Sequence, residues 1–200
     1  MALLFVTCLA VSCTKYTYVE GMVPQLFIVP INTTIPIVNA KTVTFSLNID
    51  GNACKINITT QRFKAIYGAS TVYNYAANDS VIYATISSPI ITFEVKNSSI
   101  NKYSKGAVMS ENAFFASDGL SFFEANKKTP YTGNYNTISQ ISTILLNFGI
   151  NQDGYIHFKV NDSKYPSLNG WIHVIINEKT IVFDQCAYQT FDNIIAGAMQ

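Results

Sequence analysis

The sequence TVTFSLNIDGNACKINIT at residues 42–59 places an apolar side chain at nearly every second position. Such alternation is typical of a β-strand with one buried face. Asp50 and Gly51 interrupt the alternation, and this dipeptide suits the tight turn of a hairpin. Residues 42–59 are therefore predicted to form two antiparallel strands with one apolar face.

Most of the remaining chain shows the same strand character, without helical periodicity between the strands. This favours an all-β antiparallel sandwich with little helix, and a partly open barrel is the alternative. The segment 105–135 has no sustained period and predicts long loops with short strands. The predicted strands outside the hairpin lie near 23–29, 63–67, 71–75, 81–86, 91–96, 143–148, 155–160, 170–176 and 180–183.

Composition excludes several classes of protein. The 200 residues suit a single domain, and 48% hydrophobic residues with only 12% charged residues exclude a disordered chain. The net charge is +1 and no cluster of Lys or Arg is present, so nucleic acid is not an expected partner. The longest apolar runs are shorter than the roughly 20 residues of a membrane-spanning helix. No cofactor motif is present, and we expect no cofactor.

The N-terminus has the features of an export signal. Ala2–Val11 is mostly apolar, and Cys13 follows Ala-Val-Ser as in a bacterial lipoprotein processing site. We expect a signal segment at 1–12, acylation of Cys13, a tether at 13–24 and one domain at 25–200. Plain secretion and a buried N-terminal strand are the alternatives. The protein is thus expected to be exported to the cell envelope or outer surface and tethered to the membrane by its lipid.

The C-terminal region resembles a pattern in uncharacterised exported bacterial proteins, which is written "GF-F", "YGWI-V", "YAYE" and "I-AG". LNIDGN at 47–52 is similar to the acidic strand end near the start of those domains. The resemblance implies an exported β-rich domain and no known activity. His173 and Cys186 depart from the pattern, so it implies no ligand set. The matching segments are GYIHFKV at 154–160, GWIHV at 170–174, CAYQ at 186–189 and IIAG at 194–197.

Two cysteines lie outside the signal segment and tether. Cys54 shares the alternation of the apolar residues that follow it and is predicted to face inward. The face of Cys186 is obscured by the irregular run that precedes it. In an oxidising compartment the two thiols could form a disulfide, and the alternative is two separately buried thiols.

The two histidines are candidate metal ligands. If Val160 pairs with Gly170, His157 lies opposite His173 on one face of the sheet. Asp184 on the next strand would then complete a set of two histidines and one carboxylate. A polar outer face of the sheet is the alternative explanation for these residues.

Trp171 is a candidate ligand-binding residue because it shares the alternation of His173, on the less apolar side of its strand. Together with Tyr155 it could stack on a sugar ring or contact a protein partner. The alternative is that the long middle segment buries this tryptophan.

The chain has no nucleophile elbow, no His-Glu-x-x-His motif and no phosphate-binding loop. We therefore expect a non-catalytic surface or envelope module that binds a glycan or a protein. The alternative is a hydrolase or metal enzyme whose site is built from loops within residues 105–135.

Overall fold

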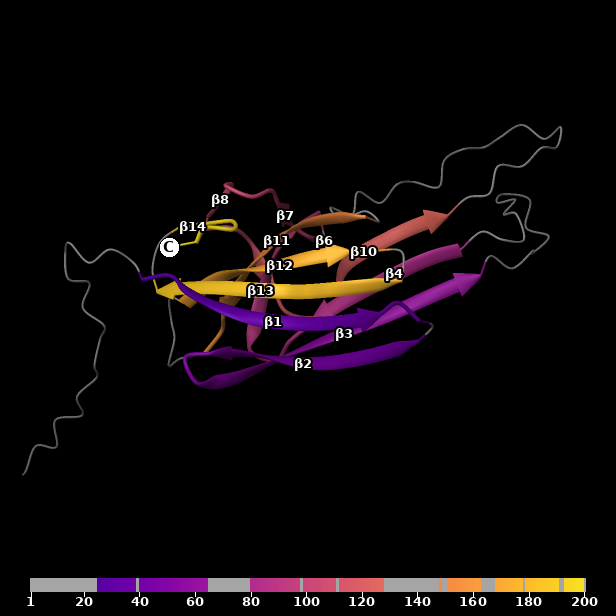
Figure 1. The fold of residues 1–200 in the computed structure, drawn as a ribbon, viewed down its shortest axis with the longest axis horizontal. Coiled ribbons are helices and arrows are strands. Elements are labelled where there is room, and N and C mark those ends of the chain that lie inside the picture. Colours follow the sequence, from indigo (N-terminus) through magenta and orange to yellow (C-terminus); the bar gives the residue numbers. More distant parts are fainter. Residues whose placement is uncertain are drawn as a thin grey trace, which may run out of the picture.

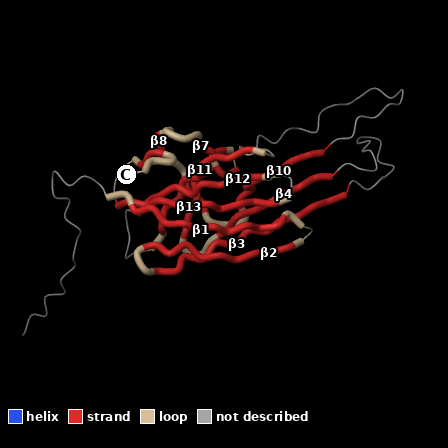
Figure 2. The backbone as a smooth tube through the Cα atoms, in the orientation of Figure 1, coloured by secondary structure: helices blue, strands red, loops and turns tan. Residues whose placement is uncertain are grey.

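A computed structural model describes residues 25–38, 40–64, 80–97, 99–110, 112–127, 148, 151–162, 168–177, 179–190 and 193–199. All regular elements within these residues are strands, so the prediction of an all-β fold is confirmed (Figures 1 and 2). The strands are β1 (Phe27–Pro36), β2 (Lys41–Ile49), β3 (Asn52–Lys64), β4 (Ser80–Ser87), β5 (Ile91–Lys96), β6 (Ser99–Ile100), β7 (Lys102–Tyr103), β8 (Val108–Met109), β9 (Phe115–Ala116), β10 (Leu120–Lys127), β11 (Gln152–Val160), β12 (Leu168–Ile176), β13 (Thr180–Thr190) and β14 (Ile194–Ile195).

One large sheet forms most of the molecule, in the order β1-β13-β12-β11-β5-β6-β10-β4-β3-β2. β7 adds to β11, β9 adds to β5, and β8 pairs with β14 in a separate small sheet. The large sheet curls until its two edge strands approach each other. Of the two predicted architectures, the sandwich and the partly open barrel, the structure has the barrel. We call the junction between β1 and β2 the seam, because these neighbouring edges are not paired in the sheet.

The hairpin predicted from residues 42–59 is present as β2 and β3. Ile49 pairs with Asn52 across a two-residue turn, and both Asp50 and Gly51 have positive φ angles. Two successive positive φ values match the right-handed twist of the flanking strands. Phe45 is buried on the apolar face and Thr44 is exposed on the other, as the alternation predicts.

The core of the sheet is one continuous apolar cluster. The sequence predicts that alternate residues of β11 and β12 share its buried face, and this is confirmed because all of them belong to the cluster. These residues are Ile156, Phe158, Val160, Ile172, Val174 and Ile176.

β11 and β12 are buried on both faces, which the alternation does not predict. Over the outward face lies an outer layer, which we define as β8, β14 and the adjoining residues 104–110 and 193–199. Met109 and Ile194 of this layer pack with Trp171 of β12 in a second apolar cluster. In Figure 1, β8 and β14 lie together at one end of the sheet, near the C-terminus.

Candidate functional site

Glu94 of β5 and His157 of β11 form a buried acid–imidazole pair. Phe158 pairs with Phe93 in the antiparallel ladder, and continuing this register places His157 beside Glu94 on the outward face. His157 Nδ1 donates a hydrogen bond of 2.8 Å to Glu94 Oε2. Glu94 is 6% exposed and His157 is 0% exposed, so the pair is shielded from solvent.

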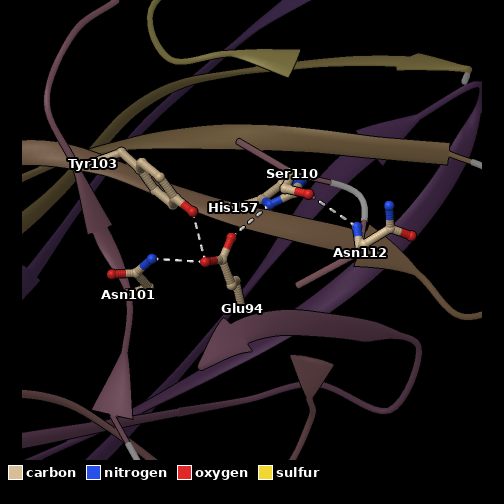
Figure 3. Close-up of polar contacts among 6 residues, drawn as sticks. All are labelled: Glu94, Asn101, Tyr103, Ser110, Asn112 and His157. Atoms are coloured by element: carbon tan, nitrogen blue, oxygen red, sulfur yellow. Dashed lines mark hydrogen bonds and ion pairs between the residues drawn. The ribbon is translucent and has the colours of Figure 1, made fainter. Parts of the chain in front are cut away.

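Two further side chains donate to the other oxygen of the Glu94 carboxylate. Asn101 Nδ2 lies 2.7 Å from Glu94 Oε1, and the Tyr103 hydroxyl lies 2.6 Å from the same atom (Figure 3). Asn101 and Tyr103 come from the turn after β6 and from β7, so the carboxylate joins these segments to β11. Hydrogen bonds to an ionised acceptor are stronger than neutral ones, and this cluster therefore stabilises the local structure.

Hydrogen bonding outweighs burial at Glu94. Burial by itself raises the pKa of this carboxyl, but the hydrogen bonds from His157, Tyr103 and Asn101 lower it, and the net shift is downward. The pKa of Tyr103 is raised, first by burial and then by its hydrogen bond to Glu94 and the charge of that carboxylate. At neutral pH the cluster thus holds an ionised Glu94 and a neutral Tyr103.

Catalytic sites that use histidine as a general base also contain a carboxylate that orients the imidazole. In such a base the second ring nitrogen faces the substrate. Here His157 Nε2 is buried and has no hydrogen-bond partner, Phe115 packs against the ring with centroids 5.0 Å apart, and Trp171 is the cross-strand neighbour. Glu94 orients the ring and joins β5 to β11 and β7, and the imidazole of His157 is fully buried.

The contribution of Glu94 to stability should depend on pH. Because its folded pKa is below the ordinary value of 4.5, the contribution is complete above that value and is lost as pH falls through the folded pKa. We expect the difference in unfolding free energy between wild type and Glu94→Gln to be constant from about pH 7 down to about 5 and to shrink below about 4.5. Urea denaturation at a series of pH values measures this difference. A difference that grows on acidification would contradict the assignment.

His173 forms a second acid–imidazole cluster that is closer to solvent. Its Nδ1 lies 3.2 Å from Asp184 Oδ2, and its Nε2 lies 3.4 Å from Asp153 Oδ2. Tyr155 stacks on the ring with centroids 4.7 Å apart. Both carboxylates are largely exposed, so these contacts contribute only about 0–1 kcal/mol.

The predicted register between β11 and β12 is wrong, and with it the predicted metal set. Gly170 pairs with Phe158 and not with Val160, because β12 begins at Leu168, two residues before the strand start that the sequence predicts. His157 therefore lies opposite Trp171, and His173 lies opposite Tyr155. The predicted neighbourhood of His173 and Asp184 is confirmed. Within the described ranges, no group of three His, Cys, Asp or Glu side chains is arranged to hold a metal ion.

The prediction that Trp171 lies on the less buried side is also wrong. Trp171 is 0% exposed and Tyr155 is buried beside it, with the two rings edge to face at 5.1 Å. The outer layer covers both rings, in agreement with the alternative that the middle segment buries the tryptophan. Neither ring presents a face for a sugar or a partner.

The cysteines fall into two groups. Cys54 and Cys186 are buried free thiols in this structure, and their disulfide stays a prediction. Cys13, the signal segment at 1–12 and the tether at 13–24 lie outside the described residues.

Glu94, Asn101 and Tyr103 were not predicted as site residues. The only signal for them in the sequence is a carboxylate within the strand predicted at 91–96. The alternative of a loop-built enzyme site at 105–135 falls partly on residues that are not described. The acid–imidazole pair that does form comes from β5 and β11, which lie outside that segment.

The segments that resemble the exported bacterial pattern lie in β11, β12, β13 and β14. Three of them are adjacent strands of the large sheet, and the fourth belongs to the outer layer that packs on those strands. Comparisons of the chain with protein-family models, curated proteins and solved structures find no match.

Proposed function

We propose that this protein is an exported, lipid-anchored and non-catalytic surface or envelope module that binds a partner protein. The observation that carries the proposal is the outward side of the small β8–β14 sheet. Val108 and Ile195 pair there and are 60% and 48% exposed. Their neighbours Met109 and Ile194 face inward and are fully buried, so this small sheet is apolar on both sides.

One apolar side suffices to cover Trp171. A layer with no other task would carry polar residues on its outward side, because contiguous exposed apolar surface favours association. Met199 of the same outer layer is also strongly exposed, at 61%. We call Val108 and Ile195 the outward apolar pair and propose that the partner protein binds there.

A protein is favoured over a glycan as the partner. Sugars bind flat aromatic faces, but the outward apolar pair contains no aromatic ring, and Trp171 and Tyr155 beneath the outer layer are buried. The outward apolar pair is aliphatic, which suits apolar side chains of another protein.

The anchor at Cys13 rests on the sequence alone. None of the described residues forms a helix of the length and apolar character that would cross a bilayer. We expect full-length protein made in a bacterial host to incorporate radiolabelled palmitate and the Cys13→Ala variant not to do so. Absence of label in the wild type would contradict the anchor.

A photo-crosslinking amino acid at position 108 tests the partner. We expect irradiation of cells to yield an adduct with a defined protein at this position and none at position 179. Lys179 is exposed between β12 and β13, and the connection of these two strands lies at the opposite end of the sheet from β8 and β14 in Figure 1. The Ile195→Asp variant should reduce the yield at position 108 at least tenfold. Equal yields at 108 and 179, or an adduct removed by glycosidases, would contradict a protein partner at this surface.

A further inference from the structure

We propose that Cys54 of β3 and Cys186 of β13 form a disulfide across the seam when the chain folds in the presence of a disulfide oxidant. Both side chains are buried in the main core. β3 lies next to the edge strand β2, and β13 lies next to the edge strand β1. The bond would therefore join the second strand from each end of the large sheet, whose edge strands β1 and β2 are not paired with each other.

Two contacts across the core define how β13 packs against the β2–β3 hairpin. The rings of Phe45 and Phe183 lie 4.8 Å apart between centroids. Further along, the backbone N–H of Asp50 donates a 3.0 Å hydrogen bond to the hydroxyl oxygen of Tyr188. Residues 45–50 and residues 183–188 therefore face each other across the core and run in the same direction toward the hairpin turn.

The two thiols lie between these contacts. On the hairpin, Cys54 is the cross-strand partner of Leu47, which is midway between Phe45 and the turn. On β13, Cys186 lies between Phe183 and Tyr188. The two cysteines thus lie at the same level on facing parts of the curled sheet, as a disulfide across the core requires.

A β-bulge turns Cys186 toward the interior. Val174 pairs with Phe183, but Ile172 pairs with Cys186, so β13 has one extra residue between these pairs. Without the bulge, Phe183 and Cys186 would point to opposite faces, because their numbers differ by an odd count. With the bulge both are fully buried in the same core.

The pKa shift of Cys186 agrees with the proximity of the two thiols. The pKa of Cys186 is raised to about 12, first by burial and second by the neighbouring Cys54. Burial, followed by the charge of Asp162, raises the pKa of Cys54. Both thiols are protonated at neutral pH in the folded protein, and the thiolate is the reactive form. Oxidation is therefore expected during folding, before the core closes.

The reaction balances with oxidised glutathione as the co-reactant. A thiolate of one cysteine attacks glutathione disulfide, which gives a mixed disulfide and releases one glutathione. The second cysteine attacks this mixed disulfide and releases the second glutathione. Two S–H bonds are lost and one S–S bond forms, and the two electrons and two protons leave on two glutathione thiols.

The test uses the full-length chain refolded either with oxidised and reduced glutathione or with dithiothreitol. After tryptic digestion of the oxidised sample, mass spectrometry should find peptide 42–55 joined to peptide 180–200, and reduction should separate them. The denaturant midpoint should be higher for the oxidised wild type than for the reduced one, because a cross-link restricts the unfolded chain. Cys186→Ala should show no such difference, while Cys13→Ala should retain it.

Some results would overturn the inference. One is that Cys54 and Cys186 remain open to alkylation after oxidative refolding and unfolding. Another is that Cys54 is joined to Cys8 or Cys13, and a third is that oxidation lowers the midpoint. The inference does not depend on the proposed partner or anchor, because purified protein suffices for the test and the crosslinking and palmitate experiments address those separately.

Discussion

Replacement of Phe158 by alanine is expected to lower the free energy of unfolding by about 3–5 kcal/mol. The ring is fully buried in the main core. It also lies against Gly170, where an added Cβ would come within 2.5 Å of the ring. The glycine thus leaves the space that the ring fills, and truncation would leave a cavity that the sheet backbone cannot close. Equilibrium unfolding in urea measures the loss.

Lys159→Ala is the matched control on the opposite face of the same strand. The Lys159 ammonium lies 4.6 Å from the centroid of the Phe115 ring, and such a contact contributes about 0.5–1 kcal/mol. We therefore expect this variant to lose much less stability than Phe158→Ala. If Lys159→Ala were the more damaging change, the assignment of the two faces of β11 would be wrong.

Replacement of Glu94 by alanine is expected to lower the free energy of unfolding by about 3–5 kcal/mol at neutral pH. The carboxylate is the acceptor for His157, Asn101 and Tyr103, and the side chains of Glu94 and His157 are almost fully buried. Its removal would leave the fully buried His157 ring and the half-buried Asn101 and Tyr103 side chains without the acceptor that positions them. Urea denaturation compared with the wild type gives the size of the loss.

Asp184→Ala provides the control for Glu94→Ala. It also removes a carboxylate from a histidine, but the Asp184 side chain is 44% exposed, so water can replace the lost contact. We expect a loss of about 0–1 kcal/mol. Equal losses for the two variants would show that burial does not strengthen the Glu94 cluster.

The proposed function and the buried pair are connected through the outer layer. Tyr103 and Phe115, which contact Glu94 and His157, flank the segment that carries β8. The cluster therefore fixes the two ends of the segment that presents Val108 to solvent. In the proposed binding module, the buried acid–imidazole pair supports the binding surface and does not itself contact the partner.

Alternation of apolar and polar residues sufficed to predict the all-β fold and the hairpin at 42–59. Each depends on contacts between residues close in sequence, such as the pairing of Ile49 with Asn52 across Asp50-Gly51. Alternation also identified the core face of β11 and β12, because one face of any such sheet must be buried.

The surroundings of the candidate site could not be predicted in this way. Alternation indicates which face is more apolar. The burial of Trp171 on the other face depends on β8 and β14, and Phe115 of β9 packs on the buried His157 ring; all three strands are distant in sequence. The pairing of Glu94 with His157 requires β5 to lie beside β11, a choice made by the topology of the whole sheet.

Strand register and bulges were decided by the tertiary structure as well. The polar residues before Gly170 are compatible with either a loop or a strand, and packing of β12 between β11 and β13 extends the strand to Leu168. The bulge before Cys186 reverses the inside–outside pattern of β13, and a pattern of period two cannot reveal an inserted residue. Local periodicity thus determines the type of each element, whereas register and the covering of a second face depend on free energies that arise only when distant segments pack together.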